Sequence, residues 1–91
     1  MAAPIFIADT DSLRAVELEG LSVMFHPRSG MTHILAPPSP QILEVLEEGP
    51  ADAQAIVARL RVRFDFPEGE GDEAVAARLA ELEAAGLVRR A

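Results

Sequence analysis

The sequence predicts a single α+β domain in which a three-stranded antiparallel sheet precedes three helices. Two patterns predict this fold class. Before residue 36 apolar and polar residues alternate as in half-buried strands, whereas from Ser39 onward apolar residues recur at helical spacing. The length of 91 residues allows one small core, so residues 1–91 are expected to form one domain.

Three strands are expected in the N-terminal third. The first is Ala15–Glu19, where Val16 and Leu18 share one face. Leu21–His26 and Met31–Leu35 are the second and third strands. Both are rich in β-branched and other apolar residues, and short turn segments separate them, as is typical of consecutive strands of one sheet.

The four residues from Pro27 to Gly30 favour a tight hairpin between the second and third strands. Proline presets φ, and Gly30 supplies a positive φ. With this loop, Met24 lies opposite His33. The other, core-facing side of the hairpin is then expected to carry Val23, Phe25, Thr32 and Ile34.

The first helix is expected to follow the stiff segment Ala36-Pro37-Pro38. Ser39 is a suitable N-cap, and Pro40 fits the first helical position, where no N–H is needed. Gly49 is placed to end this helix with a positive φ. Its apolar stripe consists of Ile42, Leu43 and Leu46.

Two further helices are expected, from Asp52 as N-cap to about Phe64, and from Asp72 to Ala85. Gly86 ends the last helix, after which Leu87 and Val88 pack back onto the core. The expected buried residues of these two helices are Ile56, Val57, Leu60, Phe64, Val75, Leu79 and Leu82. This order of strands and helices is winged-helix-like.

Composition excludes several classes of protein. The chain has no cysteine, which excludes disulfides and thiol catalysis, and no apolar run approaches the length of a bilayer span. Pro4–Ala8 is too short for a signal peptide, so a cytoplasmic protein without a membrane partner is expected. The net charge of −7 favours neutral or basic partners such as peptides and proteins.

The strongest indication of nucleic-acid binding is a group of three arginines expected on the outer face of the second helix, Arg59, Arg61 and Arg63. At a spacing of two residues their side chains fan around a helix instead of forming a stripe. The expected third helix is acidic, and the chain has no Trp or Tyr for base stacking. Nucleic acid is therefore not an expected partner.

Catalytic and metal-binding patterns are missing from the sequence. His26 and His33 are the only histidines, and no acidic residue lies beside them to complete a metal site. Glu44, Glu47 and Glu48 read as a solvated helix face. Without a nucleophile motif or a phosphate-binding glycine loop, we expect no enzyme activity, no metal and no cofactor.

The segment Met31–Leu35 is the last expected strand before the helices, which favours a place at the sheet edge. An edge strand offers unpaired N–H and C=O groups to an extended peptide. Strand addition of a peptide is thus one possible function, while an interior or protected strand is the alternative.

From about Leu13 to Val88, the sequence resembles the PqqD-like peptide chaperones, which implies that this stretch is the core of the domain. Three segments carry the resemblance. They are the hairpin Val23–Leu35, the helix Pro40–Pro50 and the closing segment Leu79–Val88. Within the hairpin, Ser29-Gly30-x-Thr32-His33-x-Leu35 is similar to the subgroup of the HPr-rel-A system. Two positions depart from the family pattern: Ala15 and Leu18 stand where a bulky aromatic residue is common in the first strand, and Ala51 stands where a Thr or Ser cap is common.

The resemblance implies a RiPP recognition element, a winged-helix-like domain for ribosomally synthesised and modified peptides. Such a domain is non-catalytic. It binds the leader of a precursor peptide as an added strand and presents it to a modifying enzyme encoded nearby. The peptide-binding residues implied are Met31, Thr32, His33, Ile34, Leu35, Val75, Arg78, Leu79 and Leu82. A monomer or weak dimer is expected.

Two alternatives come from other classes of protein. One is an acidic winged-helix regulator that binds protein or DNA. The other is a structural subunit of a larger complex. A neighbouring gene for a short precursor peptide would favour the peptide chaperone over both.

Overall fold

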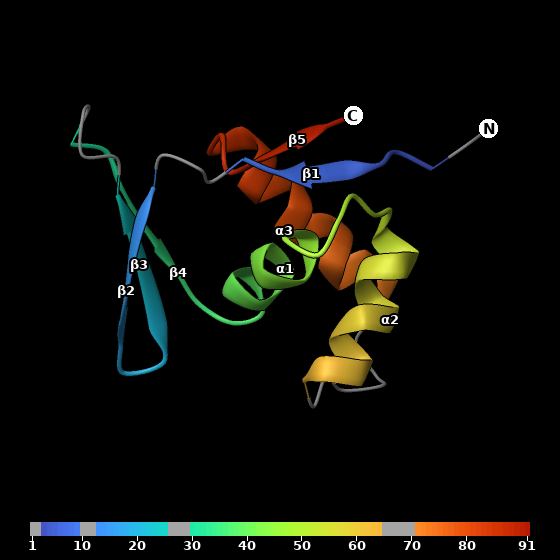
Figure 1. Cartoon of the computed structure of the whole chain (residues 1–91), viewed down its shortest axis with the longest axis horizontal. Coiled ribbons are helices and arrows are strands. Elements are labelled where there is room, and N and C mark those ends of the chain that lie inside the picture. Colours follow the sequence, from blue (N-terminus) through green and yellow to red (C-terminus); the bar gives the residue numbers. More distant parts are fainter. Residues whose placement is uncertain (1–2, 10–12, 26–29, 65–70) are drawn as a thin grey trace.

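The computed structural model describes residues 3–9, 13–25, 30–64 and 71–91 (Figure 1). The elements follow in the order β1 (Phe6–Ala8), β2 (Arg14–Leu18), β3 (Leu21–Phe25), β4 (Thr32–Leu35), α1 (Ser39–Leu46), α2 (Ala53–Arg63), α3 (Asp72–Ala84) and β5 (Val88–Arg90). The α+β fold with a three-stranded antiparallel sheet followed by three helices is therefore confirmed.

Two short terminal strands, β1 and β5, were not expected from the sequence. They pair antiparallel with each other, and Phe6 also exchanges backbone hydrogen bonds with Ala51 at 2.8 and 3.1 Å. Phe6, Leu87 and Val88 are buried in the core. Strands of three residues carry too little alternation to be recognised, although the return of Leu87 and Val88 to the core was expected correctly.

The sheet β2-β3-β4 is built from two hairpins. Glu19 and Gly20 connect β2 to β3 with φ of 50° and 84°, and two positive φ values characterise a two-residue type I′ turn. In the second hairpin, Met24 pairs with His33 as predicted. His26, Pro27, Arg28 and Ser29 lie outside the described residues, whereas Gly30 has the predicted positive φ, at 73°.

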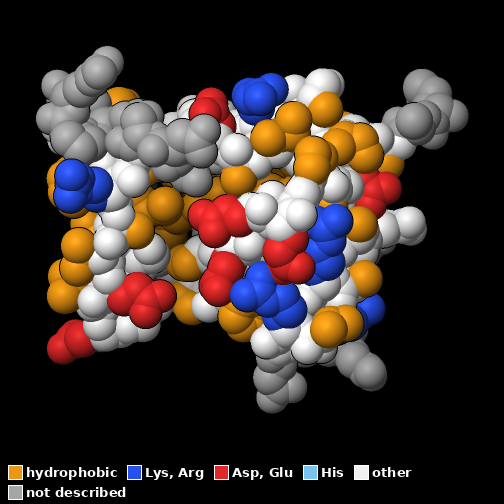
Figure 2. All heavy atoms as spheres, in the orientation of Figure 1, with side chains coloured by type: hydrophobic (Ala, Val, Ile, Leu, Met, Phe, Trp, Pro, Cys, Tyr) orange, Lys and Arg blue, Asp and Glu red, His pale blue; other side chains and the backbone are white. Residues whose placement is uncertain are grey.

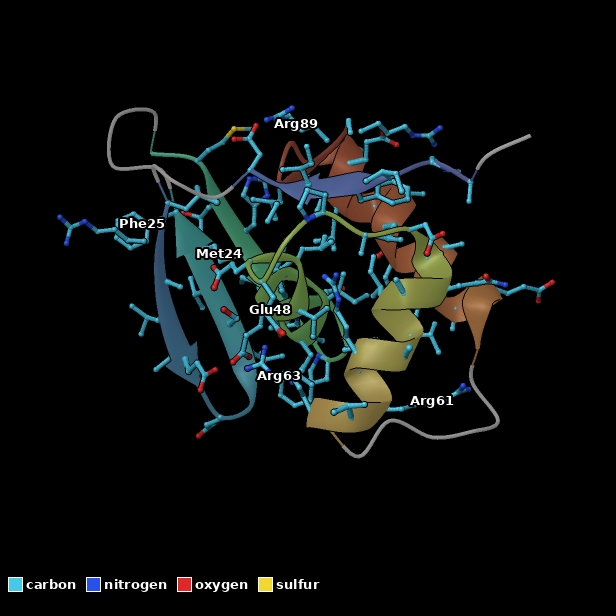
Figure 3. The ribbon with its side chains drawn as sticks, turned by 45° about the vertical axis from the view of Figure 1, so that its right-hand side comes forward. Met24, Phe25, Glu48, Arg61, Arg63 and Arg89 are labelled. Carbon is cyan, nitrogen blue, oxygen red and sulfur yellow. The ribbon has the colours of Figure 1, made fainter. Side chains whose placement is uncertain are left out.

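The predicted core-facing side of this hairpin was wrong. Met24 and Leu35 pack against the core, whereas Ile34 on the opposite side is 66% exposed. Figure 3 shows the neighbouring residues Met24 and Phe25 pointing to opposite sides of the sheet, with Met24 directed toward the helices. The side assigned to the core, with Val23, Phe25, Thr32 and Ile34, is therefore the outer side. The alternation of the sequence predicts which residues share a face. It does not identify the core-facing side here, because both faces carry apolar residues.

The helices agree closely with the sequence pattern. Asp52 caps α2, accepting a hydrogen bond from the Ala55 N–H at 2.8 Å. Gly86 follows α3 with a φ of 79°. One detail was wrong: Pro38 is the N-cap of α1, and Ser39 is its first helical residue, without a side-chain cap bond. The two prolines beside Ser39 fix the backbone, which moves the helix start by one residue.

The core is assembled mainly from the three helices. The residues predicted to be buried are buried in α1 (Ile42, Leu43, Leu46), α2 (Ile56, Val57, Leu60) and α3 (Val75, Leu79, Leu82). Phe64 is half-buried against this cluster. The sheet β2-β3-β4 lies at one side of the helices (Figure 1) and reaches the core through partly buried Met24 and Leu35, while Leu13 packs there from just before β2.

Gly30 offers a test of the hairpin. Its φ of 73° disfavours side chains, and a Cβ there would meet nothing within 4 Å, so backbone conformation alone sets the penalty. Gly30→Val should lower the free energy of unfolding by about 1 kcal/mol or more, measured by urea denaturation. Gly30→Asn is the control, because Asn tolerates positive φ. Equal losses in both variants would contradict this account.

Candidate functional site

Strand β4 forms one edge of the three-stranded sheet. β3 pairs with one side of β4, and no strand among the described residues pairs with the other. Every second N–H and C=O group of an edge strand points away from its neighbour and is available to a new strand. Thr32–Leu35 therefore has an open edge, and Met31, 59% exposed, lies immediately before the strand.

A hollow lies beside the end of this strand. Pro37 and Pro38, which connect β4 to α1, form it together with Ala74 and Arg78 from the first half of α3, and its volume is about 410 Å³. Because Ala74 and Arg78 are one helical turn apart, both lie on the same flank of α3. We call this hollow the β4–α3 groove.

The structure separates the predicted helical site residues into two groups. Val75, Leu79 and Leu82 are fully buried in the core, so they hold α3 in place and do not reach the groove. Arg78 does line the groove. The family resemblance implied these core residues together with Arg78, whereas Ala74, which lines the groove, was not among the implied residues.

Arg78 is held by a weak ion pair. Its guanidinium lies 2.9 Å from the Glu81 carboxylate, one turn further along α3, and both side chains are exposed. An exposed pair at this spacing contributes roughly 0.2–0.5 kcal/mol. An acidic ligand group in the groove can therefore replace Glu81 at little cost.

The opposite flank of α3 carries a smaller hollow of about 250 Å³, lined by residues that include Phe6, Ala76 and Ala80. Arg90 spans it, since its side chain binds Glu83 at 3.1 Å and lies 5.6 Å from the centre of the Phe6 ring. The two strands beside this hollow, β1 and β5, are only three residues long, and Phe6 of β1 is also bridged to Ala51. The β4–α3 groove is thus the better peptide site.

The three arginines of α2 do not act as a group. Arg59, predicted on the outer face, is half-buried and donates hydrogen bonds to the carbonyls of Val45 and Gly49 at 3.2 and 2.9 Å, which corrects that prediction. It satisfies carbonyls at the end of α1, where a cation is favoured. Arg61 is exposed and points away from the other labelled arginine of this helix in Figure 3.

Arg63 reaches back to two carboxylates of the α1 region. It binds Glu44 at 3.2 Å and also Glu48, as Figure 3 shows, and its guanidinium lies 5.5 Å from the Phe64 ring centre. The hydrogen bond with Glu48, with the charges of Glu48 and Glu44, raises the pKa of Arg63 above its usual value. Arg63 therefore stays protonated, and its ion pairs join the end of α2 to the α1 region.

Three other features of the described residues bear on function: metal ligands, the histidines and membrane-spanning helices. No three His, Cys, Asp or Glu side chains among them gather as metal ligands. His33 is half-buried on the inner side of β4, opposite Met24, while its predicted companion His26 lies outside the described residues. Within the same residues, no helix combines the length and the apolar character that a bilayer span requires.

Comparisons with known proteins agree with this architecture. The sequence matches the family of coenzyme PQQ synthesis protein D (PqqD) over residues 22–88. The fold is similar to a chain in the structure of TbiB1 in complex with the TbiA(beta) leader peptide, with a TM-score of 0.65 and 18% identity, covering 91% of this chain and 94% of that chain. No curated protein matches the sequence.

Because Arg59 and Arg63 already bind backbone carbonyls and carboxylates of the α1 region, we expect that the protein does not bind duplex DNA at physiological salt. Phosphate neutralisation needs free cations on one surface, and α3 provides one arginine among several carboxylates. A mobility-shift assay at about 10 µM protein should show no complex, whereas specific DNA readers bind at about 10⁻⁸ M. Salt-sensitive binding near that value would contradict this assignment.

Proposed function

The chain belongs to the PqqD family, and we propose that it is a non-catalytic peptide chaperone. It binds the leader of a ribosomally synthesised precursor peptide and presents it to a modifying enzyme encoded nearby. The observation that carries the proposal is the open edge of β4 beside the β4–α3 groove. The similar TbiB1 fold, solved with a leader peptide, supports the same assignment.

Strand addition at β4 accounts for affinity. An extended leader that pairs with Thr32–Leu35 gains backbone hydrogen bonds, which demand little of its sequence. Its side chains then alternate between the two faces of the widened sheet. Those on the inner face point toward α3 and reach the β4–α3 groove.

The β4–α3 groove accounts for the selection of particular leader sequences. Pro37, Pro38 and Ala74 form a rigid surface without charge, and Arg78 adds a cation at its margin. Because the groove is shallow and small, it suits one or two side chains of the leader. An apolar or small residue beside an acidic one is the pattern that fits this lining.

The chemistry on the precursor belongs to a separate enzyme in this proposal. The candidate site consists of a strand edge, two prolines, an alanine and an exposed arginine. None of these groups is a nucleophile or general base poised for catalysis. The domain therefore acts by positioning the leader.

Charge reversal at Arg78 tests the proposal. We expect Arg78→Glu to weaken binding of a leader with an acidic side chain at the groove by about 5- to 30-fold, or about 1–2 kcal/mol. The probe is a fluorescently labelled synthetic leader from the precursor encoded beside this gene, and the measurement is its anisotropy. Arg61→Glu is the matched control, because Arg61 is an exposed arginine on another helix.

A steric pair of variants complements the charge reversal. Ala74→Leu fills the groove, whereas Ala77→Leu adds the same side chain at an exposed position of the same helix. Leader binding should fall in the first variant and remain in the second, with unchanged circular dichroism in both. Equal effects of Arg78→Glu and Arg61→Glu, together with unaffected binding by Ala74→Leu, would place the leader elsewhere.

A further inference from the structure

The sheet β2-β3-β4 has an apolar face turned away from the helices. Directly paired residues of antiparallel strands share a face, so the register places six apolar residues on this side. They are Val16, Leu18, Leu21, Val23, Phe25 and Ile34, which we call the outer sheet face. Figure 3 shows Phe25 pointing outward from it.

This face is accessible in the described structure. Val16, Leu18 and Ile34 are 49%, 57% and 66% exposed, and the described helices all lie on the other side of the sheet (Figure 1). A sheet with one solvated face normally carries polar residues there. A contiguous apolar face on the solvated side of a sheet is a candidate interaction surface.

Charged residues stand at opposite ends of the outer sheet face. Arg14 shares the row of Phe25 at one end, and Glu19 lies in the turn beyond Leu18 at the other. Within the described part of the chain neither has an ion-pair partner. Figure 2 shows orange side chains along the left margin, with a blue side chain above them and red ones below.

We propose that a second copy of this chain covers the outer sheet face. A two-fold axis in the interface, perpendicular to the strands, places the row of Val16, Val23 and Ile34 on its own counterpart. The same axis brings Phe25 of one copy over Leu21 of the other. It also brings Arg14 beside Glu19 of the other copy, so both apolar and charged groups are self-complementary, as an isologous interface requires.

The dimensions of the face make this a weak, reversible dimer. Three strands about 4.8 Å apart and five residues of about 3.4 Å each give a face of roughly 15 by 17 Å. That is well below the area of about 800 Å² per partner in stable complexes. The net charge of −7 on each copy also opposes association at long range.

This arrangement leaves the peptide site open. Sheets that pack face to face lie about 10 Å apart, and their strand edges stay exposed. Since the axis runs perpendicular to the strands, both β4 edges lie on the same side of the dimer. Two leaders could therefore bind side by side, although the dimer itself does not depend on leader binding.

Sedimentation velocity of the full chain without peptide, from about 10 µM to about 1 mM, tests the dimer. We expect a reversible shift from monomer toward dimer. Leu18→Glu should weaken association at least about ten-fold. Val62→Glu on α2 is the matched control and should leave it unchanged, because Val62 is 86% exposed and belongs to a helix, outside the outer sheet face.

Exchanging the charges of Arg14 and Glu19 tests the proposed orientation of the two copies in the dimer. Arg14→Glu and Glu19→Arg should each weaken the dimer, and the double variant should restore it. The two positions are about 17 Å apart along one copy, so they can form an ion pair only with the other copy. Circular dichroism confirms that each variant is folded. A monomeric chain at about 1 mM, equal weakening by Val62→Glu, or no restoration in the double variant would overturn the proposal.

Discussion

The buried stripe of α3 is the constraint on which the rest of the structure depends. Val75, Leu79 and Leu82 fix the rotation of α3 in a core that one short chain must fill. Once this stripe faces inward, Ala74 and Arg78 necessarily lie on the adjoining flank, beside the prolines that follow β4. The groove is therefore a consequence of core packing, and it needs no dedicated structural element of its own.

A small core also explains why the sheet has open surfaces. The helices and the terminal strands β1 and β5 supply most of the buried residues, and the sheet β2-β3-β4 contributes a few partly buried side chains from its inner face. Within the described ranges, no further strand pairs with the edge of β4, and several apolar side chains of the other face stay exposed. These uncovered surfaces are the ones that we assign to a second copy and to a peptide.

The helices could be predicted from sequence because each has local signals. Asp52 is a cap, Gly86 is a stop, and the apolar periods mark the buried stripes. The hairpin register also followed from the loop length, but its inward face did not, because both faces carry apolar residues. Strand β4 could be placed at an edge from its position in the chain, whereas the partners of Arg59 depend on tertiary packing that no local pattern contains.

In the proposed function, β4 accepts a peptide as an additional strand. Amide hydrogen exchange measured by NMR, with and without a saturating leader, tests it most directly. Protection should rise at alternate residues of Thr32–Leu35, because only the N–H groups on the open edge gain partners. Unchanged exchange in β4, with new protection confined to α2 or to the outer sheet face, would contradict it.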